Sequence, residues 1–308
     1  MKAVRLHEYG APSKLIYEDA PDPIPAEGEV LVSTAAASIN PVDYKIRQGG
    51  YQHRFPQTLP AILGRDISGI VAALGPNTTG FTIGDRVMAL AKQTYAELVT
   101  VKASDLAHVP GGLDLVEAAA LPLVTLTGHQ LITRACELQP GQTVLVTGAV
   151  GGVGRTAVFT AKQIGATVIA GVRASQLEEA KTIGADEILI LDDDNIAKFG
   201  LIDAVANAIA GPIAEKLLHH IKPGGVFGTV LAPPETAKLH PTIRINPIMV
   251  EPNAQDLYDL AVAVRDHKLH IPIDRMIPLS ETAEGHAAFE KGGIGKVLLL
   301  ASEKKAWT

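Results

Sequence analysis

The 308-residue sequence contains only one cysteine and has no cluster of basic residues. The single cysteine, Cys136, cannot form a disulfide within the chain, and with scattered histidines it cannot supply a thiolate zinc cage. With 27 basic and 33 acidic residues the formal net charge is −6, and both signs are spread along the chain. The sequence therefore predicts a protein of the reducing cytoplasm that binds neither nucleic acid nor a membrane.

An uninterrupted apolar run long enough for a membrane helix is also missing. The nearest candidate, residues 115–133 (LVEAAALPLVTLTGHQLIT), contains polar or helix-breaking residues and predicts a buried helix. These residues are Glu117, Pro122, His129 and Gln130. Residues 1–21 alternate like a strand and lack the apolar core of a signal peptide, so we expect no export signal.

The remaining composition, 47% hydrophobic and 19% charged, is sufficient for two ordinary cores. Up to about residue 110, short β-like runs alternate with turn residues, which indicates an antiparallel β region. From about residue 115, strands and helices alternate, which is typical of a doubly wound parallel sheet. The predicted strands are 143–147, 167–171, 187–191, 202–207, 225–231 and 243–249, and the predicted helices include 152–164, 175–183 and 212–221. The apolar tail predicts a helix and a strand that rejoin the first region.

A glycine-rich loop, residues 148–154 (GAVGGVG), connects the predicted strand 143–147 to the helical pattern that follows. Glycines at such a junction allow a tight turn and bring the first amides of the helix against a pyrophosphate, where the helix dipole favours negative charge. The alternative is that the glycines serve only close packing of strand on helix. The strand-loop-helix context favours dinucleotide binding.

The end of the next strand bears on which dinucleotide binds. An acidic residue there would bind the ribose 2′-hydroxyl of NADH, but Arg173 occupies the position, and a guanidinium suits the 2′-phosphate of NADPH. NADPH is therefore favoured. Two observations oppose this: lone charged residues usually face solvent, and Asp192–Asp194 would repel a phosphate if they faced it.

The same loop, TGAVGGVG, also fits the pattern of short-chain dehydrogenases, which use a Tyr-x-x-x-Lys pair. After residue 147 the only tyrosine is Tyr258, and Val262 rather than a lysine stands four positions on. The loop also lies in mid-chain, whereas that fold begins with it. The short-chain reading is therefore excluded.

Several sequence segments, in order along nearly the whole chain, resemble those of the zinc-free quinone oxidoreductases. This family is the zeta-crystallin-like branch of the medium-chain dehydrogenase/reductase superfamily. The segments are ASINPVDYKIRQGGY (37–51), LGRDISGIVAALG (63–75), GDRVMAL (84–90), YAELV (95–99), AALPLVTLTGHQLI (119–132), LQPGQTVLVTGAVGGVG (138–154) and GKVLLL (295–300). The resemblance implies a GroES-like, β-rich catalytic domain of residues 1–115 and 269–308. It also implies a Rossmann domain of residues 116–268, with NADPH bound in the cleft.

The resemblance and the loop motif together assign the candidate site residues. Asn40 and Tyr51 are the expected catalytic contacts, Asn40 beside the nicotinamide and Tyr51 at the acceptor oxygen. The expected cofactor-binding residues are Pro41, Asp43, Tyr44, Thr127, Val150, Gly151, Gly152, Val153, Gly171, Arg173, Ser175, Leu231, Gly295 and Lys296. Two alternatives to these roles stay open. Tyr51 could lie in a surface loop without a function, and Asp43 could cap or turn the chain after Pro41.

The sequence departs from related proteins at several positions. Zinc-dependent relatives carry a Cys and a Gly-His-Glu where this chain has Asn40 and Gly64-Arg65-Asp66, so no metal is expected. NADPH-preferring members usually have a Ser and a Lys after the second strand, which leaves Arg173 to act alone or with Ser175. Asn207 stands where an Asp is common, with no consequence assigned.

The expected absence of zinc favours an acceptor whose negative charge delocalises, because an alkoxide needs stronger stabilisation. The leading hypothesis is an NADPH-dependent reductase of quinones or α,β-unsaturated carbonyls. An enoyl-thioester reductase of the same fold and a non-enzymatic dinucleotide-binding protein are the alternatives. We also expect a homodimer, because the last strand of the parallel sheet would otherwise leave an exposed edge.

Overall fold

A computed structural model describes residues 1–293 and 295–301 of the chain; Ile294 and residues 302–308 of the expected C-terminal segment lie outside the described residues. The chain forms two compact units. The terminal unit consists of Met1–Leu123 and the chain from Pro252 onward, and the central unit is Val124–Glu251. The unit boundaries differ from the expected ones because the turn Glu117–Ala120 packs on strands of the terminal unit, as does helix α7 (Ala254–Arg265).

The central unit contains a parallel sheet of six strands within the described residues, and it has the order β11-β10-β9-β12-β13-β14. Its strands are β9 (Thr143–Thr147), β10 (Thr167–Val172), β11 (Glu187–Ile190), β12 (Ile202–Asn207), β13 (Ile221–Thr229) and β14 (Arg244–Pro247). The expected doubly wound Rossmann sheet is therefore confirmed. The strand order reverses between β9 and β12, and ligands of such sheets bind beyond the carboxyl ends of the strands at this point.

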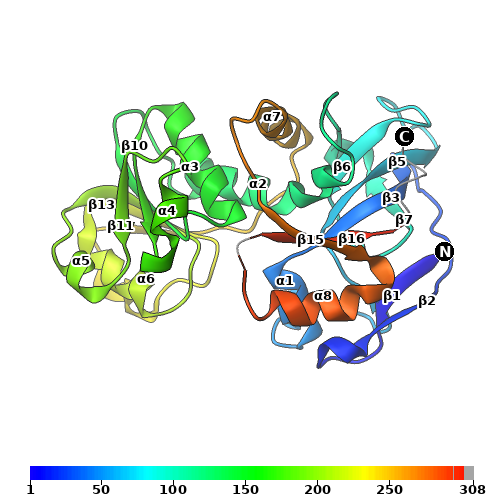
Figure 1. The fold of residues 1–308 in the computed structure, drawn as a ribbon, viewed down its shortest axis with the longest axis horizontal. Coiled ribbons are helices and arrows are strands. Elements are labelled where there is room, and N and C mark those ends of the chain that lie inside the picture. The colour runs from blue at the N-terminus through cyan, green and yellow to red at the C-terminus, as the bar shows by residue number, and fades with distance from the viewer. Residues whose placement is uncertain (294, 302–308) are drawn as a thin grey trace. The chain divides into compact units, whose positions relative to one another are not determined.

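Helices cover both faces of the parallel sheet, as Figure 1 shows. Along β9, Val144 and Val146 pack in the cluster that includes α3, whereas Leu145 packs in the cluster that includes α6. The helices of this region are α2 (Pro122–Gln130), α3 (Gly152–Ile164), α4 (Leu177–Ala180), α5 (Asp193–Ala197) and α6 (Pro212–Leu217). The predicted helix 152–164 has the bounds of α3. The predicted helices 175–183 and 212–221 are shorter, because tighter turns occupy Ala174–Gln176 and Leu218–His220.

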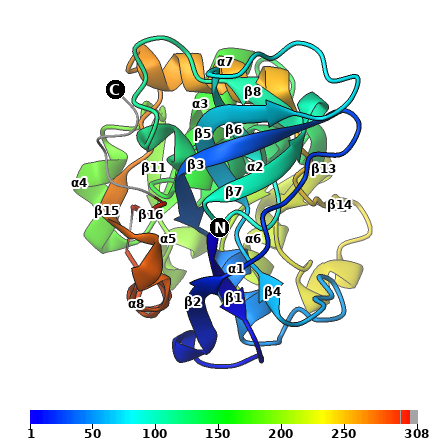
Figure 2. The same cartoon turned by 90° about the vertical axis from the view of Figure 1, so that its right-hand side faces the viewer.

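The terminal unit is rich in antiparallel strands, and both ends of the chain contribute to its larger sheet (Figure 2). The strands are β1 (Lys2–Leu6), β2 (Leu15–Asp19), β3 (Glu29–Ile39), β4 (Ala61–Ile62), β5 (Asp66–Leu74), β6 (Arg86–Leu90), β7 (Leu98–Lys102), β8 (Leu106–His108), β15 (Ile273–Pro278) and β16 (Lys296–Leu300). The helices are α1 (Pro41–Arg47), α7 and α8 (Thr282–Phe289). Strand β16 pairs with β3 from the first part of the chain, which confirms that the tail rejoins this region.

The apolar segment 115–133 folds into short helices, among them α2, and most of its residues are buried. Among the residues that the structure describes, no helix has both the length and the apolar character needed to cross a membrane.

Candidate functional site

The glycine-rich loop leaves β9 at Gly148, whose φ of 63° is a conformation that strains other residues. The loop closes on itself, since the Gly151 N–H donates to the Gly148 carbonyl at 3.0 Å. The first hydrogen bond along α3 joins the Arg155 N–H to the Gly151 carbonyl at 2.8 Å. The amides of residues 152–154 precede it and therefore have no carbonyl of their own helix to bind. They form a group of donors at the positive end of the helix dipole.

Close packing explains why glycines are needed in this loop. A Cβ atom on Gly154 would lie 2.2 Å from the Gly148 carbonyl oxygen, so no larger residue fits. The Ala149 N–H donates to the Gly171 carbonyl at 3.3 Å, which ties the loop to β10. A Cβ on Gly171 would in turn lie 3.1 Å from Leu191. The loop therefore lies at the carboxyl end of the sheet, beside the strand that leads to Arg173.

Arg173 and Ser175 follow β10 directly and are exposed. The backbone of Arg173 is held in a turn: its N–H donates to the Gln176 side chain at 3.1 Å, and its carbonyl accepts from the Gln176 N–H at 2.9 Å. The backbone is thus fixed while the guanidinium is open to solvent. A phosphate contact of Arg173 stays a prediction.

A buried hydrogen-bond network joins the strand ends beside the loop. The Thr147 hydroxyl donates to Asn207 Oδ1 at 3.0 Å, and Asn207 Nδ2 donates to the Thr229 hydroxyl at 3.2 Å. The Leu231 N–H donates to that same hydroxyl at 3.1 Å, and Leu231 is half-buried. An aspartate at position 207 would lose the donor, which gives Asn207 a structural role that the sequence left open.

Thr127, on α2, has a hydroxyl without a hydrogen-bond partner in the described part of the chain, although the residue is only 7% exposed. Buried polar groups are normally hydrogen-bonded, so an unsatisfied hydroxyl fits a ligand contact. Together with the amides of residues 152–154, it gives the central unit donors suited to a dinucleotide.

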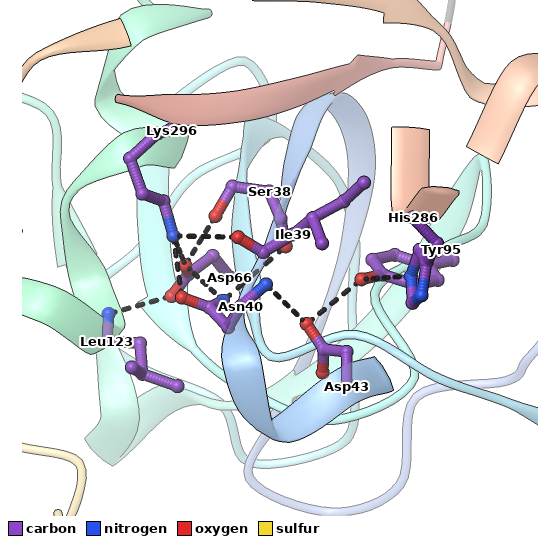
Figure 3. A network of polar contacts seen from close by, with 9 residues as sticks. All are labelled: Ser38, Ile39, Asn40, Asp43, Asp66, Tyr95, Leu123, His286 and Lys296. Atoms are coloured by element: carbon purple, nitrogen blue, oxygen red, sulfur yellow. Dashed lines mark hydrogen bonds and ion pairs between the residues drawn. The ribbon is translucent and has the colours of Figure 1, made fainter. Parts of the chain in front are cut away.

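In the terminal unit, the Asp66 carboxylate is fully buried and accepts from four donors (Figure 3). Oδ1 accepts from the Leu123 N–H at 2.7 Å. Oδ2 accepts from the Ser38 hydroxyl, from Asn40 Nδ2 at 2.8 Å and from the Lys296 ammonium at 3.1 Å. A buried carboxylate is tolerated only with such pairing.

The Lys296 ammonium also donates to the Ile39 carbonyl at 3.3 Å and to Asn40 Oδ1 at 2.6 Å, so three acceptors surround its three protons. The Asn40 amide is held at both its oxygen and its nitrogen, and neither residue is more than 5% exposed. The structure thus places both side chains in this network, and their expected contacts with the nicotinamide stay predictions. Position 295 requires a glycine, because a Cβ atom there would lie 2.5 Å from the backbone nitrogen of Asp274.

Asp43 caps helix α1, which is one of the two roles that the sequence left open. Its Oδ2 accepts from the Asn40 N–H at 2.8 Å and from the Tyr95 hydroxyl at 2.9 Å. That hydroxyl lies 3.2 Å from Nε2 of His286. Burial raises the pKa of Asp43 to about 6, whereas burial and the nearby Arg47 charge lower the pKa of His286 to about 3.

The tyrosines near α1 are half-buried, and Pro41 is exposed. The Tyr44 ring lies 6.4 Å from that of Phe289. The Tyr51 ring stacks on Phe55 with centroids 6.1 Å apart, and the Lys45 ammonium lies 5.4 Å from the Tyr51 ring centroid. Tyr51 is thus packed by neighbours on two sides.

Sequence reasoning did not identify Tyr95 and His286, and it noted Asp66 only for its place in Gly64-Arg65-Asp66. One available signal is the position of each polar residue within an apolar pattern: Asp66 begins DISGIVAAL and His286 lies in GHAAF. Their partners are distant in the sequence and gave no signal.

Comparisons with known proteins agree with this architecture. Residues 26–172 match the alcohol dehydrogenase GroES-like domain model, and residues 183–299 match the zinc-binding dehydrogenase model. A chloroplast envelope quinone oxidoreductase homolog of Arabidopsis thaliana is 29% identical, over 97% of this chain and 98% of that protein. The solved quinone oxidoreductase of Coxiella burnetii is 29% identical with a TM-score of 0.88, over 98% of this chain and 99% of that one. Mycobacterial Rv1454c, solved with NADPH, is 26% identical with a TM-score of 0.84, over 97% and 100% of the chains.

The chain belongs to the quinone oxidoreductase branch of the medium-chain dehydrogenase/reductase superfamily. The terminal unit accordingly contains the GroES-like fold and the central unit the Rossmann-like sheet. Asn40 and Arg65 stand where zinc-dependent relatives are expected to carry metal ligands. The Asn40 side chain is hydrogen-bonded to Asp66 and Lys296, and the Arg65 Nε donates to the Ala91 carbonyl at 3.0 Å. Across residues 1–293 and 295–301, no cluster of three or more His, Cys, Asp or Glu side chains is arranged to hold a metal ion.

The shifted pKa values of Asp43 and His286 predict opposite effects of pH on this quinone oxidoreductase relative. Because the folded state favours protonated Asp43, that residue's contribution to stability is present at low pH and is lost as pH rises from 3.8 toward about 6. Because the folded state favours neutral His286, that residue's contribution is lost as pH falls from 6.5 toward about 3. The stability differences between wild type and D43N, and between wild type and H286Q, should change with pH in opposite directions.

Urea unfolding of the three proteins at several pH values between about 4 and 6.5 measures these differences. The advantage of wild type over H286Q should grow as pH rises, and its advantage over D43N should shrink. Parallel pH dependences for the two variants would contradict the assigned pKa directions.

Proposed function

We propose that this chain is an NADPH-dependent oxidoreductase that transfers a hydride to a quinone or an α,β-unsaturated carbonyl. The observation that carries the proposal is the glycine-rich loop at the strand-order reversal, followed along β10 by Arg173 instead of an acidic residue. The branch of the superfamily supports the reaction class.

The central unit supplies the contacts for the cofactor. The amides of Gly152 and Val153 would bind the pyrophosphate, and the Thr127 hydroxyl would bind near the nicotinamide. Arg173, with Ser175, would bind the 2′-phosphate. When bound, NADPH supplies the hydride, and the side chains of this chain supply binding and orientation.

Two of the three aspartates in the acidic run after β11 have local partners. Asp192 caps α5, since its carboxylate accepts from the Asn195 N–H at 2.8 Å. Asp193 forms an ion pair with the Lys216 ammonium. Both carboxylates therefore have local cationic or amide partners, which reduces their repulsion of a phosphate.

The residues at the positions of zinc ligands support the proposed acceptor class. Asn40 and Arg65 cannot replace a Lewis acid, so an acceptor that delocalises its own charge into a phenolate or enolate is favoured. We propose that the Tyr51 hydroxyl donates a hydrogen bond to the acceptor oxygen. The ring is held by Phe55 and Lys45, which limits the entropy lost on binding.

We also propose a cytoplasmic homodimer. Strand β14 pairs with β13 along one side and has no strand along its other side within the described residues. A second copy of this chain would cover that edge. The single, buried Cys136, whose pKa burial raises to about 12, is compatible with a reducing compartment.

Oxidation of NADPH in the presence of candidate acceptors tests the proposed function. We expect turnover of 9,10-phenanthrenequinone or of short 2-alkenals by the purified protein. Turnover of crotonyl-CoA alone would instead support an enoyl-thioester reductase. NADPH binding without turnover of any acceptor would contradict an enzymatic function.

Replacement of Arg173 tests the cofactor preference. R173A should raise the KM for NADPH about tenfold or more, because a charge-assisted phosphate contact is lost, and should change the KM for NADH little. R244A is a matched control, since Arg244 is a half-exposed arginine at the opposite, amino-terminal end of a strand of the same sheet. An equal change for both nucleotides would refute the phosphate role of Arg173.

A further inference from the structure

Arg155 is a buried arginine in α3, close to the start of the helix. It is 7% exposed, and both ends of its guanidinium are bound within the central unit. Nε donates to the Val150 carbonyl at 2.8 Å, and Nη2 forms an ion pair with Glu179 of α4. A buried guanidinium with two such partners fixes the groups that it contacts.

The contact with Val150 fixes the peptide group at the centre of the glycine-rich loop. The carbonyl of the Val150–Gly151 peptide accepts from Arg155, while its N–H donates to the Gly148 carbonyl at 3.0 Å. Both polar atoms of this peptide are therefore held. The orientation of this peptide determines the direction of the N–H groups of residues 152–154. Arg155 therefore positions the amides of the proposed pyrophosphate-binding loop, although it lies outside the loop.

The contact with Glu179 reaches the segment that carries Arg173. Helix α4 follows directly on the turn of residues 173–176, whose backbone is closed by Gln176. Ala180 of the same helix packs in the buried cluster that contains Val150. One guanidinium thus links the loop after β9 to the turn and helix after β10.

We propose that Arg155 is a positioning residue that couples the pyrophosphate loop to the turn bearing Arg173. The preference for NADPH over NADH then depends on the Arg155–Glu179 pair, because this pair joins the loop at Val150 to the helix that follows Arg173. This inference rests on the proposed cofactor, and it extends cofactor specificity to a residue beyond the glycine motif and the strand end.

Variants of Arg155 and of Glu179 are expected to change nucleotide binding in different ways. R155M releases both contacts, so binding of NADPH and of NADH should weaken, because both contain the pyrophosphate. E179A releases only the link to α4, so binding of NADPH should weaken about fivefold, within the usual range of coupling between sites, with little change for NADH. The dissociation constants of R155K should lie between those of wild type and R155M, because a single ammonium cannot make both contacts of the guanidinium.

The test measures dissociation constants of NADPH and NADH by nucleotide fluorescence for wild type and the three variants. The control is K162M. This variant also removes an ion pair of α3, that of Lys162 with Asp186, but near the carboxyl end of the helix, away from the loop. Equal weakening of both nucleotides in E179A, or R155M binding like K162M, would overturn the inference. Selective loss of NADPH binding in E179A would support it.

Hydrogen exchange on the nucleotide-free proteins separates this inference from the proposed function. We expect R155M to speed amide exchange both in residues 150–154 and in residues 174–180, and K162M to leave both segments unchanged. Failure of wild type to bind either nucleotide would contradict the proposed cofactor. Independently of that result, faster exchange of R155M in only one of the two segments would refute the coupling.

Discussion

The buried carboxylate of Asp66 is the charge on which the polar interior of the terminal unit depends. It receives hydrogen bonds from β3, from β16 and from the start of α2, and its contact with Lys296 joins residues 230 apart in sequence. Without these donors the ionised group would be prohibitively costly to bury. The same contacts hold the Asn40 amide, whose backbone N–H is held in turn by Asp43. Asp66 and Asp43 together therefore hold the geometry at the start of α1.

The central unit depends on a different constraint, the close approach of backbone atoms in the glycine-rich loop. There the polar groups are amides rather than ionised side chains, and their positions follow from the start of α3 and from the contact of Arg155 with Val150. Both units hold their polar groups through contacts made by neighbouring elements. This arrangement is expected of a preorganised binding site.

The parts of the fold that are local in sequence were predictable. The alternation of apolar strands with helices predicted the parallel sheet. The helix after the loop has its predicted bounds because Gly151 and Gly165 terminate it at its two ends. The helix expected at 175–183 is shorter, since the turn closed by Gln176 occupies its start. After Ala180, tight turns in which the Thr182 and Ile183 N–H groups donate three residues back replace its end. The position of Arg173 after a strand end is likewise visible in the sequence alone, and its contact with a phosphate stays a prediction.

The buried network was not predictable, because its partners are brought together only by tertiary structure. Lys296 and Asn40 were assigned to the cofactor by resemblance, which stays a prediction, and nothing in the sequence indicated that both side chains bind Asp66. The sequence left two roles open for Asp43, and the contact of its carboxylate with the Asn40 N–H shows the capping role. Pairings of this kind carry no periodicity that a sequence pattern can report.

A double-mutant cycle on Asp66 and Lys296, read out by urea unfolding, tests the dependence on this carboxylate most directly. D66N and K296M should each lower the free energy of unfolding by about 3–5 kcal/mol, because each leaves a buried partner uncompensated. The double variant should lose clearly less than the sum of the two. Losses that add to within about 0.5 kcal/mol would contradict the account, since they would show that the two groups do not act as a pair.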